Sequence, residues 1–193
     1  MNYTLVNAPA TEPVSSTEAK AFLRVTGTDE DTLITTLIST ARQIVEKATG
    51  RALITQTWRL TMDAFPDSDR ISLERWPVAT VASLKYYPAD GSAQVTWTAS
   101  GNYLVNADSG ILSLVNGVSW PSTIRRPDAV QIEFTAGAAN AAAVAEELKH
   151  SVLLVISHLY ENRAAVSMAG APNEIPYSLR HLLESQRVGG WCA

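Results

Sequence analysis

Three carboxylates in one short stretch are the residues with the greatest potential for chemistry. Asp63, Asp67 and Asp69 flank Pro66, and side chains of this type can bind a cation or transfer a proton. An EF-hand calcium loop needs carboxylates at alternate positions, a central glycine and a late glutamate, and that full pattern is missing here. The stretch therefore favours a solvated turn, and a small enzyme with a site near Asp63–Asp69 is the alternative.

The histidines and the cysteine do not supply a metal or nucleophile site. His150 and His158 are eight residues apart on a predicted helix, which turns them about 80° from each other, so they do not converge on one ion. One cysteine, Cys192, excludes an intrachain disulfide and a cysteine-based zinc cluster. Glycine-rich phosphate loops and the HExxH and GxSxG motifs are missing. The sequence thus predicts no catalytic residue, no metal and no cofactor.

The basic and aromatic residues indicate contacts with other macromolecules. Arg125 and Arg126 form the only basic pair, which predicts either a charged loop or a surface that meets a partner's acids or DNA phosphates. Trp76 and Trp120 each precede a proline at a predicted strand end, where exposed rings would suit a protein interface. Trp191 follows two glycines and is a candidate anchor into another chain.

Composition places these residues in a globular protein of mild negative charge. The 193 residues are 46% hydrophobic and 18% charged, and 19 acids against 15 bases give a net charge of −4. Residues 1–51, 52–137 and 138–193 hold six, eight and five acids against five, six and four bases. This distribution argues against tight DNA binding. The first residues lack the features of a signal peptide, and no apolar run is long enough to span a bilayer.

Two helices are expected near the start of the chain. Ser15 and Glu18 form a capping box for a short helix over about residues 16–25. Residues 29–49 follow with apolar positions at helical spacing and acids in the first turn, and Gly50 fits the C′ position.

Helical spacing returns in the last third of the chain. The segment 143–163 is apolar on most sides, so we expect it to be the central helix, and Leu154→Asp should unfold the chain. Small residues fill 164–174, and a last amphipathic helix covers about 176–187.

The change from period 3.6 to period 2 and back predicts an α+β fold. About six short strands with short connections make residues 52–137 an antiparallel β lobe. This lobe is inserted between helices two and three of a bundle of about four helices. We expect residues 1–51, an N-terminal arm and two helices, to form one structural unit with residues 138–193.

A set of short stretches, in order along the chain, resembles one known family. The stretches are Thr17–Lys20, Leu23–Val25, Asp29–Asp31, Leu33-Ile34, Ala41-Arg42, Val45-Glu46, Thr49–Leu53, Leu148–His150, Leu153-Leu154, His158–Arg163, Ile175-Pro176, Leu182-Leu183 and Arg187. Together they resemble the head–tail connector (adaptor, head-completion) family of tailed bacteriophages and prophages. Shorter members of that family lack an extensive β lobe.

The resemblance implies a non-enzymatic structural protein of the virion neck, present in the host cytoplasm during assembly. Such connectors form a ring, usually twelvefold, below the portal, where the ring extends the DNA channel and joins the capsid to the tail or a stopper. The implied partners are the portal protein, a stopper or tail-completion protein and other copies of the chain. Packaged DNA would pass through without specific binding, and no membrane is involved.

The resemblance also implies where the portal would bind. The C-terminal region of family members typically engages the portal, so we expect residues 164–193 to be the docking element. The candidate contacts are Leu179, Arg180, Leu183, Arg187 and Trp191. The last helix could equally complete its own bundle. A non-ring binding module that uses the β lobe as a ligand platform is a further alternative.

Overall fold

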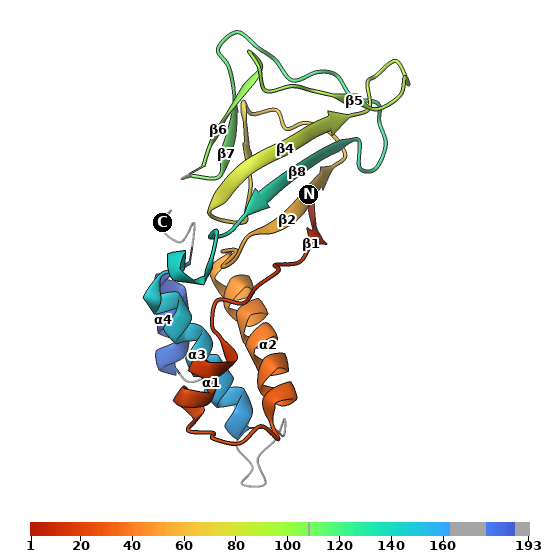
Figure 1. The fold of residues 1–193 in the computed structure, drawn as a ribbon. Helices are drawn as coiled ribbons and strands as arrows, with labels where there is room; N and C mark the ends of the chain where they lie inside the picture. The colour runs from red at the N-terminus through yellow and green to blue at the C-terminus, as the bar shows by residue number, and fades with distance from the viewer. Residues whose placement is uncertain (108, 163–176, 188–193) are drawn as a thin grey trace. The chain divides into compact units, whose positions relative to one another are not determined.

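The computed structural model describes residues 1–107, 109–162 and 177–187, and the chain divides into two units (Figure 1). The β unit comprises Met1–Ala10 and Thr55–Gly137, and the helical unit comprises Thr11–Ile54 and Ala138–Ala193. Helices and antiparallel strands are both present, so the predicted α+β class is confirmed.

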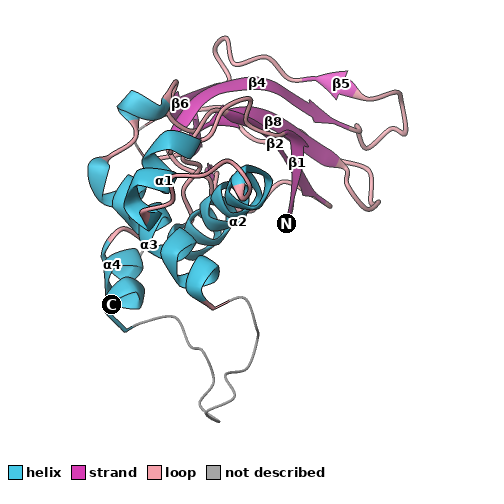
Figure 2. Ribbon diagram, turned by 60° about the horizontal axis from the view of Figure 1, so that its bottom comes forward, coloured by secondary structure: helices cyan, strands magenta, loops and turns pink. Residues whose placement is uncertain are grey.

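The β unit contains one sheet of five strands and one of three (Figure 2). Every strand pair is antiparallel, as the short connections predict. In spatial order, the larger sheet consists of β1 (Asn2–Asn7), β2 (Gln56–Met62), β8 (Val130–Ala136), β4 (Val78–Tyr86) and β5 (Val95–Thr96). The smaller sheet consists of β3 (Arg70–Ser72), β7 (Ile111–Leu114) and β6 (Tyr103–Asn106).

The first residues differ from the prediction. The sequence predicts an arm that belongs with the helical part, but Asn2–Asn7 form the edge strand of the larger sheet and belong to the β unit. Their Tyr-Thr-Leu-Val run favours extended structure. Tyr3 also fixes them, because its hydroxyl donates to the Ser72 carbonyl (3.1 Å) and accepts from the Glu74 N–H (3.0 Å).

The core of the β unit is formed by strands in which buried apolar residues alternate with more exposed ones. On β8, Val130, Ile132 and Phe134 are fully buried, whereas the residues between them are half-exposed. Opposite them on β2 lie Met62, Leu60 and Trp58, in register. The other face of these two strands is polar, and across it the Arg59 Nε donates to the Glu133 carboxylate at 3.1 Å. One face is therefore core and the other is a hydroxyl-rich surface.

The helical unit consists of α1 (Ser16–Leu23), α2 (Asp31–Thr49), α3 (Glu146–Glu161) and α4 (Tyr177–Ser185), with a short 3-10 turn at Ala141–Ala143. The predicted capping box is present at α1. The Glu18 N–H donates to the Ser15 hydroxyl (3.2 Å), and the Ser15 N–H donates to the Glu18 carboxylate (2.7 Å). The Ser15 hydroxyl also donates to the Glu18 carboxylate (2.6 Å), and this bond, followed by the one from the Ser15 N–H, holds the pKa of Glu18 below its usual value. Gly50 ends α2 in the left-handed conformation, with φ +72°.

The centre of the bundle is shared by two helices. Helices α2 and α3 pack against each other, and each of them also contacts α1 and α4. The helix α3 is therefore not the one central helix that the sequence predicts. Val152 and Ile156 are fully buried, but Leu154 is only partly buried at the margin of the core. The prediction that Leu154→Asp unfolds the chain therefore loses its premise, which was burial of Leu154 at the centre of the bundle. Because the sequence of α3 is apolar on most sides from Val152 to Leu159, its pattern does not identify the buried face.

A buried ion-pair network connects α2 with the segment before α1 and with the segment that follows α2. Arg42 is 6% exposed, and its Nε donates to the Glu12 carboxylate at 2.8 Å. A second nitrogen of Arg42 donates to Glu46 (2.9 Å), and the other oxygen of Glu46 accepts the Leu53 N–H (2.9 Å). The buried guanidinium is thus paired on two sides, as its desolvation requires.

Candidate functional site

The last helix presents a packed face and an exposed face. Leu183 is 5% exposed and belongs to the apolar core of the helical unit, so it offers no surface to a partner in this conformation. Gln186 donates to the Glu147 carboxylate, and Arg51 Nε donates to the Gln186 carbonyl at 2.9 Å. These contacts attach α4 to its own bundle, which is the second of the two alternatives left open by the sequence.

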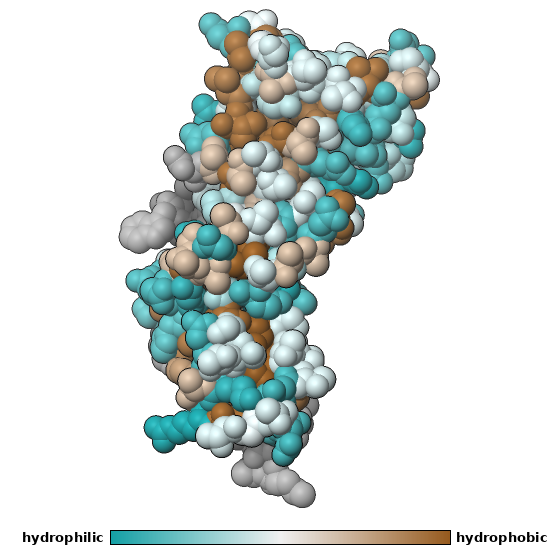
Figure 3. All heavy atoms as spheres, in the orientation of Figure 1, coloured by the Kyte–Doolittle hydropathy of each residue, from teal (hydrophilic) through white to brown (hydrophobic). Residues whose placement is uncertain are grey.

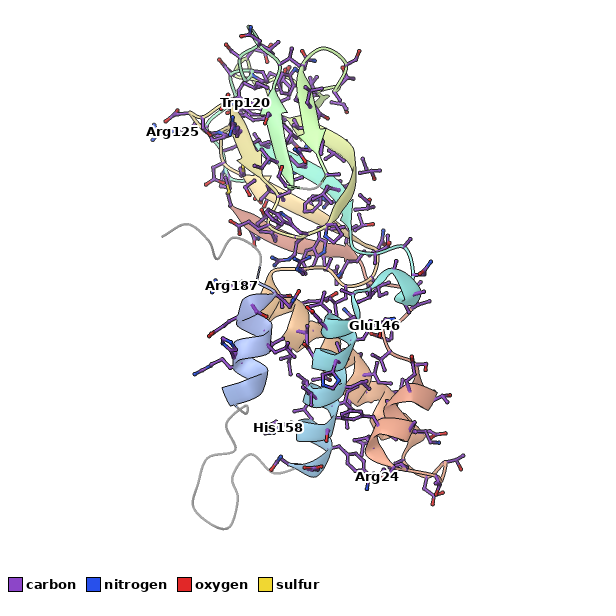
Figure 4. The ribbon with its side chains drawn as sticks, turned by 90° about the vertical axis from the view of Figure 1, so that its left-hand side faces the viewer. Arg24, Trp120, Arg125, Glu146, His158 and Arg187 are labelled. Atoms are coloured by element: carbon purple, nitrogen blue, oxygen red, sulfur yellow. The ribbon has the colours of Figure 1, made fainter. Side chains whose placement is uncertain are left out.

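The two arginines that the sequence indicated as candidate contacts lie on α4 (Arg180) and just after it (Arg187). Arg180 and Arg187 are both exposed, and neither makes an ion pair within the part of the chain that the structure describes. Arg187 lies at the same end of the helical unit as Glu146, and Arg24 and His158 lie at the other end (Figure 4). The Leu179 side chain and Trp191 lie outside the described residues. The arrangement therefore retains two of the five candidate contacts as exposed cations.

The basic pair lies on an exposed loop of the β unit. The Arg126 guanidinium is 4.0 Å from the centre of the Tyr87 ring, a cation–π contact that holds this side chain against its own unit. Arg125 points away from the unit, at the same end as Trp120 (Figure 4). Both arginines are therefore exposed, but the Arg126 side chain is held on Tyr87 whereas Arg125 points outward.

The carboxylates around Pro66 do not form a site. Asp63, Asp67 and Asp69 are all exposed, and Asp63 accepts the Asp128 N–H at 3.1 Å. Asp69 lies 3.7 Å from the Arg70 guanidinium. Among the described residues, no three His, Cys, Asp or Glu side chains are grouped so that they could hold a metal ion. No helix within the described ranges has the length and apolar composition needed to cross a membrane.

Five aromatic rings from separate segments form a cluster in the β unit, namely Phe65, Tyr86, Trp97, Tyr103 and Trp120. Phe65 and Trp120 are stacked, with ring centres 4.8 Å apart and planes at 8°, and the Trp120 indole N–H donates to the Ser68 carbonyl at 2.7 Å. Trp76 likewise donates to the Leu73 carbonyl at 2.6 Å. Both tryptophans are half-buried, and each donates a hydrogen bond to a backbone carbonyl of the β unit. Each therefore stabilises its own unit and is not a free anchor for a partner.

One contact set was not suggested by any pattern in the sequence. The Arg75 guanidinium lies 5.1 Å from the Tyr3 ring centre and 4.7 Å from the Trp58 ring centre. Burial raises the pKa of Tyr3. The contacts join β1, β2 and the segment before β4, three regions far apart in sequence. Tyr3 stands between two polar residues in β1, which is the only signal that could have identified it as a half-buried side chain.

The chain matches a family of known description. The family model "HCP: Head completion protein" matches residues 13–187. This span includes all four helices and every strand except β1. No curated protein matches the chain.

Several solved structures share the fold over nearly the whole chain. A chain in "Neck of empty GTA particle computed with C6 symmetry" has 26% identity and a TM-score of 0.79, covering 98% of this chain and 99% of that chain. A chain in "Virion of native gene transfer agent (GTA) particle" has 26% identity, a TM-score of 0.78 and the same coverage. A chain in "Neck of native GTA particle computed with C12 symmetry" has 25% identity and a TM-score of 0.72, again over 98% and 99%.

Proposed function

Because the chain belongs to the head completion protein family, we propose that it is a structural protein of the virion neck, between the head and the tail of a phage-like particle. The observation that carries this proposal is the extent of the structural likeness. It covers 98% of this chain and 99% of a chain from the neck of a gene transfer agent particle. Both units are therefore matched, including the β unit that shorter connectors lack.

We infer further that copies of the chain form a ring below the portal. The related necks were computed with C6 and C12 symmetry, and a twelvefold ring is compatible with both. Such a ring would extend the DNA channel and join the capsid to the tail or stopper. The net charge of −4 suits a channel wall, because phosphate-neutralising lysines and arginines would hold the DNA.

The test is to locate the chain in the particle by electron cryomicroscopy of the neck. The expected result is density for both units in a ring of equivalent copies directly below the portal. A virion that contains the chain only in the capsid shell or at the tail tip would contradict the neck assignment. A neck that contains the chain in a different ring would contradict only the position below the portal.

For portal binding, we propose the exposed face of α4 together with residues 186–193. Leu183 is buried in the core of the helical unit, so the residues that contact the portal would be Arg180, Arg187 and the segment that contains Trp191. Guanidinium groups pair well with carboxylates on a partner, and a tryptophan is a frequent hot-spot residue. The packing of Leu183 in the core would then fix the position of α4 so that its exposed face can make these contacts.

Deletion of residues 188–193 should separate docking from stability. We expect the truncated chain to melt within a few degrees of the full chain, because Leu183 and Gln186 remain, but to lose most of its binding to purified portal protein. Binding is measured by sedimentation with portal, and stability by circular dichroism. Leu183→Asp is the control, since it should lower the melting temperature. A truncated chain that loses stability and keeps binding would show that the segment is core.

A further inference from the structure

Strand β1 is an unprotected edge of the larger sheet. It is the first strand in the sheet order and pairs only with β2, so the N–H and C=O groups on its outer side have no strand partner among the described residues. Its sequence, NYTLVN, contains no charge and no proline. Leu5 and Val6 are 41% and 40% exposed. Natural edge strands usually carry charges, prolines or bulges that prevent pairing with another chain.

The other described sheet edges are better protected. At the opposite side of the larger sheet, β5 has two residues, and β4 carries two register shifts that disturb its ladder. In the smaller sheet, β3 has three residues and begins at Arg70, and β6 has four residues. The only comparable irregularity in β1 lies between Leu5 and Asn7, at the end of the strand. Apolar surface also gathers over the side of the β unit that contains β6 and β7 (Figure 3), but that edge is short.

The edge strand is held in a fixed position. The Tyr3 hydroxyl forms two hydrogen bonds to the segment Ser72–Glu74, and the Tyr3 ring meets the Phe134 ring edge-on at 6.5 Å. Arg75 covers the same ring at 5.1 Å. A strand fixed in this way is already ordered before a partner arrives, so pairing with it has a smaller entropic cost than pairing with a loose segment.

We propose that β1 pairs antiparallel with β1 of a second copy, so that two free chains form a dimer with a continuous ten-stranded sheet. Such a two-fold contact uses the same patch on both chains, so it does not need the protected edge at β4. A two-fold axis perpendicular to the sheet places Thr4 opposite Thr4 or Leu5 opposite Leu5. Both registers are free of like-charge repulsion because β1 has no charged residue.

The dimer would be a state of the free chain. Six-residue strands bury much less area than a standard interface, so the association should be weak and depend on concentration. A two-fold contact is not an element of a cyclic head-to-tail ring, so these dimers would have to separate before a ring forms. The proposal concerns purified chain alone, so it stands or fails independently of the neck assignment.

The test is sedimentation velocity of the purified full chain from micromolar concentrations to about 1 mM, the weak end of the affinity range. The wild type should shift from monomer to dimer, and its β1 amides should exchange hydrogen more slowly at high concentration. Val6→Lys should remain monomeric with unchanged circular dichroism. Val6 is chosen because it has no register partner on β2, so a lysine there does not face a neighbour in its own sheet.

Leu104→Lys is the matched control. Leu104 is 68% exposed on β6, the edge of the smaller sheet, so this variant should still dimerise like the wild type. A wild type that is monomeric at about 1 mM would overturn the proposal. A Val6→Lys chain that dimerises as well as the wild type, or β1 amides whose exchange does not change with concentration, would also overturn it.

Discussion

Ile156→Asp is expected to unfold the helical unit. Ile156 is 0% exposed and lies in the apolar cluster with Ile34, Val45 and Val152. A carboxylate at this position would be either charged without a partner or protonated at a cost, and the shorter side chain would leave a cavity. Together these effects should cost more than about 4 kcal/mol, a large share of the 5–15 kcal/mol that stabilises a typical domain.

The distribution of tryptophans allows each unit to be followed separately. Trp58, Trp76, Trp97 and Trp120 lie in the β unit, whereas the described residues of the helical unit contain no tryptophan. In Ile156→Asp the helical circular dichroism signal should fall strongly, while the tryptophan emission should stay close to that of the wild type if the β unit folds by itself. Leu154→Asp is the control, because this partly buried residue should tolerate the change with a much smaller loss. Equal losses in the two variants would contradict this description of the core.

Local signals in the sequence predicted the helices well. The Ser15–Glu18 capping box and Gly50 each place a helix end through bonds within a few residues, so no tertiary information is needed there. The start of α2 was predicted less well, because the helix begins at Asp31 instead of residue 29 and its N-cap Glu30 makes no side-chain cap hydrogen bond. The structure shortens the predicted first helix by two residues, because Arg24 takes a left-handed conformation with φ 59°. Boundaries of this kind depend on a single residue's conformation, which the apolar spacing does not determine.

Long-range contacts explain most of what the sequence did not show. The pairing of β1 with β2 joins residues 50 or more positions apart, and further long-range contacts support it, namely the hydrogen bonds of Tyr3 to Ser72 and Glu74 and the packing of its ring on Phe134. The buried face of α3 depends on where α1, α2 and α4 lie. For the candidate site, the sequence identified Arg180 and Arg187 as exposed cations, but it also included Leu183, whose apolar spacing suits a core and an interface equally well.

Gly110→Ala is expected to destabilise the chain more than the same substitution at Gly27, Gly50, Gly91, Gly101 or Gly117. Gly110 has φ +61°, and a Cβ there would lie 2.2 Å from Nε1 and 2.7 Å from Cδ1 of Trp76. The ring is fixed, because Trp76 Nε1 donates to the Leu73 carbonyl at 2.6 Å. The Leu73 N–H in turn donates to the Gly110 carbonyl at 2.8 Å. Movement of the indole would therefore break the first bond and disturb the second.

Gly117→Ala separates the steric part of this effect from the backbone part. Gly117 has φ +83°, and a Cβ added there would meet no atom within 4 Å, so only the left-handed backbone should cost energy, about 1–2 kcal/mol. Gly110→Ala should add the loss of the partly buried hydrogen bond from Trp76 to Leu73, about 1–3 kcal/mol more. Urea unfolding followed by tryptophan emission measures both variants on the same scale, since four of the five tryptophans lie in this unit. If the two variants lose the same stability, Trp76 is free to move and does not hold the segment between β3 and β7.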